Sequence, residues 1–201
     1  MDIAAFVASL NPFDLLVAFA LFGLFVLGFI QGTIRRLLGI AAILFSFLIA
    51  ANLRQPLGGF LAANWTHLED SYAVMIGFGT VFVAASIAFT VLIQTIYKKA
   101  PLFRKYVVVD EVIGGTFGVV QGLLILGIVI VILDSHFRIP GVQARNELPL
   151  LRETYQAYDQ SVTAGALREH LIPGLLAILG PFIPEALRAL FPAGGSPVPS
   201  T

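Results

Sequence analysis

The sequence contains no cysteine, so it can form neither a disulfide bond nor a thiolate metal site. Charged residues are scarce as well, at 12% of the 201 residues against about 25% in soluble domains. The net charge is zero, which gives no indication of a nucleic-acid partner. Apolar residues, in contrast, make up 58% of the chain, and the mean hydropathy is +0.91. This composition is typical of an integral membrane protein.

The sequence also lacks the short motifs of common catalytic and nucleotide sites, since no GxSxG, P-loop or HExxH is present. His67, His136 and His170 are far apart and have no partner at metal-ligand spacing. We therefore expect each histidine to lie in solvent or at the membrane interface. These absences predict a protein that is not an enzyme and that uses no cofactor and no metal.

Four apolar runs are each long enough to cross a hydrocarbon core of about 30 Å, which needs about 20 helical residues. No charged residue lies in the centre of any run, and the runs cover residues 13–30, 34–53, 72–97 and 112–133. The sequence thus predicts an all-α polytopic membrane protein with a four-helix transmembrane domain over residues 1–134. The short connection at Gly32 predicts a tight antiparallel hairpin of the first two helices, and Pro56 is expected to end the second.

The rest of the chain, residues 135–201, differs from the four runs in its pattern of polar and apolar residues. Residues 135–191 are expected to form an outward-facing tail, in which 150–170 is polar and helical. Residues 171–191 are apolar but contain three prolines, which predicts a broken amphipathic helix in the outer interface and not a fifth span. Residues 192–201 have the composition of a disordered end.

Basic residues in short loops indicate the cytoplasmic side of a membrane protein. The first and third connections together hold six of them: Arg35, Arg36, Lys98, Lys99, Arg104 and Lys105. We therefore predict that these two connections face the cytoplasm and that both termini face outward. Asp14 and Asp134 would then lie at the outer interface, where capping and helix-end roles are expected.

Glycines recur at four-residue spacing in two of the runs. In a membrane, small residues let helix backbones approach each other closely, and this approach drives association because burying leucine does not. The spacing therefore predicts that the first hairpin packs on the fourth helix through a glycine face made of Gly28, Gly32, Gly114, Gly118 and Gly122.

Polar side chains are few within the runs. A glutamine precedes a glycine in both glycine motifs, and the third run carries polar residues four apart; together they are Gln31, Ser86, Thr90, Gln94 and Gln121. We interpret these groups as hydrogen-bonding partners that fix the helix bundle. A polar path for a substrate is the alternative interpretation.

Several stretches together resemble the colicin V production protein family (CvpA), which are small bacterial inner-membrane proteins with four membrane helices. The matching pieces are Asn11–Asp14, GFIQGTIRRLLG at 28–39, VDEVIGGTFGVVQGLL at 109–124, ILDSHF at 132–137 and HLIP at 170–173. Members of that family often carry arginine at the positions of Gln31 and Gln121. They also often read Arg-Glu where this chain has Arg35-Arg36, and Asp-Arg where it has Asp110-Glu111.

Compared with those family members, the charge has the opposite sign at the second residue of both pairs, which is Arg36 in one and Glu111 in the other. A coupled reversal predicts an ion pair at the inner interface between Arg35 or Arg36 and Asp110 or Glu111.

The resemblance implies a non-enzymatic protein of the bacterial inner membrane, connected with colicin V production or export and with envelope homeostasis. Its expected partners are the lipid bilayer and either another membrane protein or further copies of the chain, with no nucleic acid. Two alternatives stay open. The chain could be a structural or accessory subunit of a larger membrane complex, or a small oligomeric transporter or channel.

Overall fold

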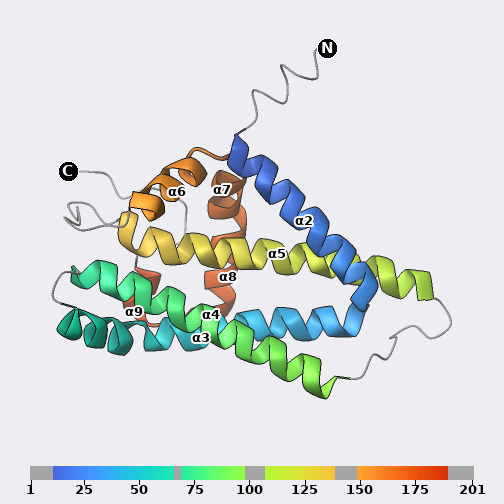
Figure 1. The fold of residues 1–201 in the computed structure, drawn as a ribbon, viewed down its shortest axis with the longest axis horizontal. Coiled ribbons are helices and arrows are strands. Elements are labelled where there is room, and N and C mark those ends of the chain that lie inside the picture. Colours follow the sequence, from blue (N-terminus) through green and yellow to red (C-terminus); the bar gives the residue numbers. More distant parts are fainter. Residues whose placement is uncertain (1–10, 66–68, 98–106, 139–148, 190–201) are drawn as a thin grey trace, which may run out of the picture.

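The computed structural model describes residues 11–65, 69–97, 107–138 and 149–189. The predicted disordered end at 192–201, His67 and the four basic residues of the third connection lie outside these ranges. The regular structure within them is helical, and no strand occurs there. Four long helices form the body of the protein: α2 (Pro12–Gln31), α3 (Thr33–Asn64), α4 (Asp70–Ile96) and α5 (Val107–Phe137) (Figure 1). The predicted all-α class is confirmed.

The start of α2 and its junction with α3 follow from local sequence. Asn11 caps α2, because its side-chain oxygen accepts a hydrogen bond from the backbone N–H of Phe13 at 2.9 Å, and Pro12 is the first helical residue. Gly32 alone separates α2 from α3, and its φ of 78° lies in the left-handed region that favours glycine.

The two helices that meet at Gly32 do not form the predicted antiparallel hairpin. They diverge from this corner, and α2 packs on α5 while α3 packs on α4 (Figure 1). A single residue in the left-handed region turns the chain, but it leaves no loop long enough to bring two helices side by side. The glycines of α5 offer α2 a closer neighbour, as described below.

Pro56 lies inside α3 and does not end it, contrary to the prediction. The helix runs for 32 residues, which is about 48 Å at 1.5 Å per residue. The part of α3 beyond Pro56 is held against α4 by a close contact between glycines. A Cβ on Gly58 would lie 2.6 Å from the Cα atom of Val74, and a Cβ on Gly77 would lie 3.1 Å from the Gly58 nitrogen.

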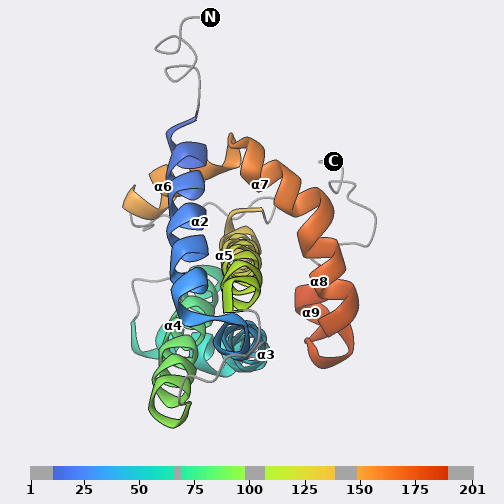
Figure 2. The same cartoon turned by 90° about the vertical axis from the view of Figure 1, so that its right-hand side faces the viewer.

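The tail consists of short helical pieces. In chain order they are α6 (Pro149–Asp159), α7 (Val162–Ala166), a π-helical turn (Leu167–Leu171), α8 (Ile172–Leu179), a 3-10 turn (Gly180–Phe182) and α9 (Glu185–Arg188). In both views, α7 and α8 run across α5 and not along it (Figure 1 and Figure 2). α8 packs on the bundle through buried apolar residues such as Ile172 and Leu175.

Five segments of the described chain are long and apolar enough to cross a membrane. They are α2, α3, α4, α5 and the tail segment Val162–Phe182. The first four match the four runs predicted from the sequence, with the third run extending one residue beyond the end of α4, so the fold is that of a polytopic membrane protein. Buried side chains such as Phe47, Phe78, Ile128 and Val131, each at 0% exposure, join α3, α4 and α5 into one core.

Candidate functional site

The predicted glycine face lies where α2 and α5 touch. A Cβ built on Gly114 would lie 2.6 Å from the carbonyl oxygen of Gly28, and one built on Gly28 would collide with the carbonyl of Gly114. A Cβ on Gly118 would collide with the carbonyl of Leu24. At these positions, backbone meets backbone with no room for a side chain.

The two remaining glycines of the predicted face are also at this contact. A Cβ on Gly122 would lie 2.6 Å from a methyl carbon of Leu24, and one on Gly32 would lie 2.6 Å from a carboxylate oxygen of Asp110. Next to Gly32, the hydroxyl of Thr33 donates to the backbone oxygen of Asp110 at 2.9 Å. The corner between α2 and α3 is therefore tied to the start of α5.

A polar pocket of about 160 Å³ lies among the four long helices near the Gly32 corner. It is formed by the end of α2, the start of α3, the end of α4 and the middle of α5. Four of the five predicted intramembrane polar residues line it, together with both arginines of the first connection: Gln31, Thr90, Gln94, Gln121, Arg35 and Arg36. Ser86 is not among the lining residues, and its backbone oxygen accepts a hydrogen bond from the Thr90 hydroxyl at 2.7 Å.

Arg36 occupies the buried side of this pocket. The residue is 6% exposed, and its Nη1 donates to the side-chain oxygen of Gln121 at 2.9 Å. Its Nε is buried and has no hydrogen-bond partner among the described residues. The amide of Gln121 is fixed in turn beside Gly39, where a Cβ would lie 2.9 Å from the amide nitrogen.

The ion pair predicted at the inner interface is not formed. Among the described residues, no ion pair joins Arg35 or Arg36 to Asp110 or Glu111. The acidic and basic groups lie at different heights along their helices. The Asp110 carboxylate lies beside Gly32, which precedes Arg36 by about one helical turn. Arg36 extends instead to Gln121, further along α5.

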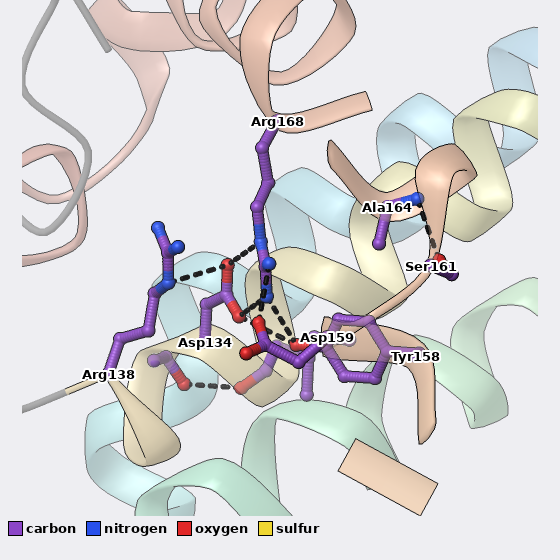
Figure 3. Close-up of polar contacts among 9 residues, drawn as sticks. Asp134, Arg138, Tyr158, Asp159, Ser161, Ala164 and Arg168 are labelled. Atoms are coloured by element: carbon purple, nitrogen blue, oxygen red, sulfur yellow. Dashed lines mark hydrogen bonds and ion pairs between the residues drawn. The ribbon is translucent and has the colours of Figure 1, made fainter. Parts of the chain in front are cut away.

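A second polar cluster lies at the other end of α5, where the tail is attached. Arg168 approaches the carboxylate of Asp134 with two nitrogens, Nε to Oδ2 at 3.0 Å and Nη2 to Oδ1 at 2.8 Å (Figure 3). The Tyr158 hydroxyl donates to the same carboxylate at 2.6 Å, and Arg168 Nη1 bonds Asp159 at 2.6 Å. Because the Asp134 side chain is fully buried, this is a desolvated and bidentate ion pair.

Tyr158 serves this cluster as a hydrogen-bond donor. Burial first, and then the negative charge of Asp134, raise the pKa of its hydroxyl well above 10.0. The guanidinium of Arg168 also stacks over the Tyr158 ring, at 5.1 Å from the ring centre. A raised pKa keeps the hydroxyl protonated, so it continues to donate to Asp134.

The beginning of α2 holds the same tail segment from the other side. The Asp14 carboxylate accepts hydrogen bonds from the backbone N–H groups of Val162 at 3.1 Å and Thr163 at 3.0 Å. Ser161 adds a second cap, because its hydroxyl accepts from the N–H of Ala164 at 3.0 Å. Asp14 therefore caps α7, which is far away in the sequence, and Asp134 binds the neighbouring residues of the same tail.

His136 lies in this region but is not solvated, which corrects the expectation from sequence. It is 0% exposed, its Nδ1 lies 3.2 Å from the Ser71 hydroxyl, and the rings of Tyr72 and Phe137 contact it edge-on. His170 is exposed, as expected. No group of metal-binding side chains occurs within the described ranges.

Sequence reasoning did not find Tyr158, Asp159 or Arg168. Asp134, which bonds Tyr158 and Arg168, lies 34 residues before Arg168, and Asp159 joins the cluster through Arg168. The available signal was chemical: an acid at the end of a membrane helix, followed by a polar tail that contains an arginine and tyrosines.

The helices, the pocket and the tail define an all-α, multi-pass membrane protein with one polar pocket among its long helices and one polar cluster where the tail meets the end of α5. Comparison with protein-family models matches the model described as colicin V production protein over residues 13–170. The chain therefore belongs to the colicin V production protein family, which confirms the resemblance seen in the sequence. Neither the curated proteins nor the solved structures contain a match to the chain.

Proposed function

We propose that the protein supports colicin V production or export, as part of envelope homeostasis, by binding other membrane proteins or further copies of itself and without enzymatic activity. The family match over residues 13–170 is the observation that carries this proposal. Surfaces for such contacts are available, because α2 presents large apolar side chains such as Leu16, Phe19 and Phe22, each at least 65% exposed.

We further propose that the protein lies in the bacterial inner membrane with four spans and both termini outside. Arg35 and Arg36 support this orientation, since basic residues favour the cytoplasmic side. The three prolines within residues 171–191 support four spans over five, because they interrupt the apolar tail segment. The tail, fastened by Asp14 and Asp134, would then cover the outer side.

The alternative of a small transporter or channel would need the polar residues to line a continuous path. Thr90, Gln94 and Gln121 meet in a bounded pocket that does not reach Ser86, so this alternative receives less support. The alternative of an accessory subunit is a form of the binding proposal and differs only in the partner.

The functional experiment is complementation. The gene would be placed in a colicin V-producing strain that lacks its own member of this family, and export would be measured as the zone of growth inhibition on a sensitive lawn. We expect the chain to restore the zone. Gly118→Leu should fail, because a side chain at this position collides with the backbone of α2, whereas Gly23→Leu should succeed because Gly23 faces open space. Failure of the intact protein, with normal amounts in the membrane, would contradict the proposal.

A further inference from the structure

The polar pocket beside Arg36 is lined by cationic and neutral polar groups. Its polar lining consists of two arginines, three glutamines and one threonine, and no acidic residue of the described ranges is part of the lining. The Asp110 carboxylate lies beside Gly32, and neither residue is among those that line the pocket. The pocket therefore offers many hydrogen-bond donors and a net positive charge, which is the chemistry that binds a phosphate group.

The Arg36 guanidinium has hydrogen-bond donors that bind no acceptor among the described residues. The residue is 6% exposed, and within the described part of the chain its Nη1 alone has a hydrogen-bond partner, while its buried Nε has none. Buried arginine groups normally find partners, because an unsatisfied charged donor is costly. Nε is shielded from the pocket space, but Nη2 is not fully buried and has no hydrogen-bond partner among the described residues, so an anion in the pocket would accept from Nη2.

The backbone favours an anion at the same place. Arg35 and Arg36 lie at the start of α3, whose first turn contains no acidic residue. The N-terminal end of a helix carries partial positive charge, so two cations there repel it. A bound anion would relieve this repulsion and neutralise both side chains together.

Size and surroundings indicate what the anion belongs to. The volume of about 160 Å³ is roughly half that of the smallest pockets that hold drug-sized ligands, so it suits a headgroup and not a whole metabolite. Leu27, which also lines the pocket, is 48% exposed, and Val91 beside Thr90 is 55% exposed. These apolar surfaces next to the opening can accept acyl chains.

From these observations, we propose that the pocket binds the phosphate of an anionic phospholipid headgroup in the inner leaflet. Arg36 and Gln121 would contact the phosphate from the buried side, and Arg35 and Gln94 from the opening. Basic pockets between membrane helices on the cytoplasmic side are suited to such headgroups. The assignment to the inner leaflet rests on the orientation proposed above, whereas the site itself does not depend on the role proposed in colicin V production.

The test is lipid titration of the purified full-length protein, followed by native mass spectrometry. Phosphatidylglycerol is the anionic probe, phosphatidylcholine the neutral one, and glycerol 1-phosphate the soluble competitor. We expect phosphatidylglycerol to bind at least about fivefold more tightly than phosphatidylcholine, as one arginine near a phosphate implies. Arg36→Gln should remove this preference.

Two further variants keep the test decisive. Gln94→Glu places a carboxylate at an exposed position of the pocket and should also weaken phosphatidylglycerol binding, even if Arg36→Gln does not fold. Arg54→Gln removes another buried arginine of α3, outside the pocket lining, and should leave binding unchanged. Equal binding of both lipids, displacement by glycerol 1-phosphate, unchanged binding in Gln94→Glu, or an equal loss in Arg54→Gln would overturn the proposal.

Discussion

Replacing Arg168 by methionine should loosen the tail from the bundle. The substitution keeps most of the side-chain volume but leaves the Asp134 carboxylate, which is fully buried, without its bidentate partner. Removing one member of a buried ion pair typically costs 3–5 kcal/mol. Tyr158 still donates to Asp134, and Arg138 lies 3.9 Å away with a half-exposed side chain, so we expect the lower end, about 3 kcal/mol.

This destabilisation can be measured as opening of the tail. The natural chain has no cysteine, so a cysteine placed at Ala164, which is 0% exposed, would be the single thiol. Its reaction with a maleimide reports how often the tail leaves the bundle. A change of about 3 kcal/mol raises the open fraction, and hence the labelling rate, by a factor on the order of 100.

Two controls make the experiment specific. Arg188→Gln removes an exposed arginine whose pair with Glu185 spans 3.6 Å, and it should leave the labelling rate unchanged. Adding Asp134→Asn to Arg168→Met should restore much of the protection, because the uncompensated charge is removed while Tyr158 keeps an acceptor. An unchanged labelling rate in Arg168→Met would refute the reasoning that this ion pair holds the tail.

Three further predictions concern other contacts. Gly118→Ala should lower the melting temperature in detergent, by the equivalent of about 1–3 kcal/mol of overpacking, whereas Gly23→Ala should not. Asp14→Ala should destabilise the tail by about 0.5–2 kcal/mol, because α7 loses its cap, and the same maleimide assay would detect this. The folded protein can be titrated to alkaline pH while the absorbance of tyrosinate is followed. Near pH 10 the Tyr158→Phe variant should give the same absorbance as the unchanged chain, because the raised pKa keeps Tyr158 protonated there. The raised pKa of Tyr158 also makes the free energy of unfolding depend on pH. Its contribution to the stability of the folded state is fully present below pH 10.0, where the unfolded tyrosine is also protonated. It should decrease above pH 10.0, because the unfolded tyrosine then loses its proton while the folded one keeps it.

The sequence was sufficient for features that depend on local composition. Apolar runs of about 20 residues identify membrane helices because the bilayer sets their length, and the family resemblance was confirmed by the match over residues 13–170. The structure also places Gly114 and Gly118 against the backbone of α2, at the spacing that suggested a packing face.

The sequence was insufficient where distant segments decide the outcome. Pro56 looked like a helix end, but packing of Gly58 on α4 accompanies a helix that continues beyond it. Arg36 looked like a partner for Glu111, but its level along α3 brings it to Gln121. The pair of Asp134 and Arg168 forms only because the tail folds back over α5, which no local periodicity encodes.

The central claim is that four helices cross the membrane and that the tail lies across the outer side. Its most direct test is labelling of single cysteines in intact cells with a membrane-impermeant maleimide, at the exposed positions Gln160, Arg188 and Val108. We predict that positions 160 and 188 react in intact cells and that position 108 reacts only after the membrane is opened. Protection of position 188 while 160 reacts would show a fifth crossing and contradict this account.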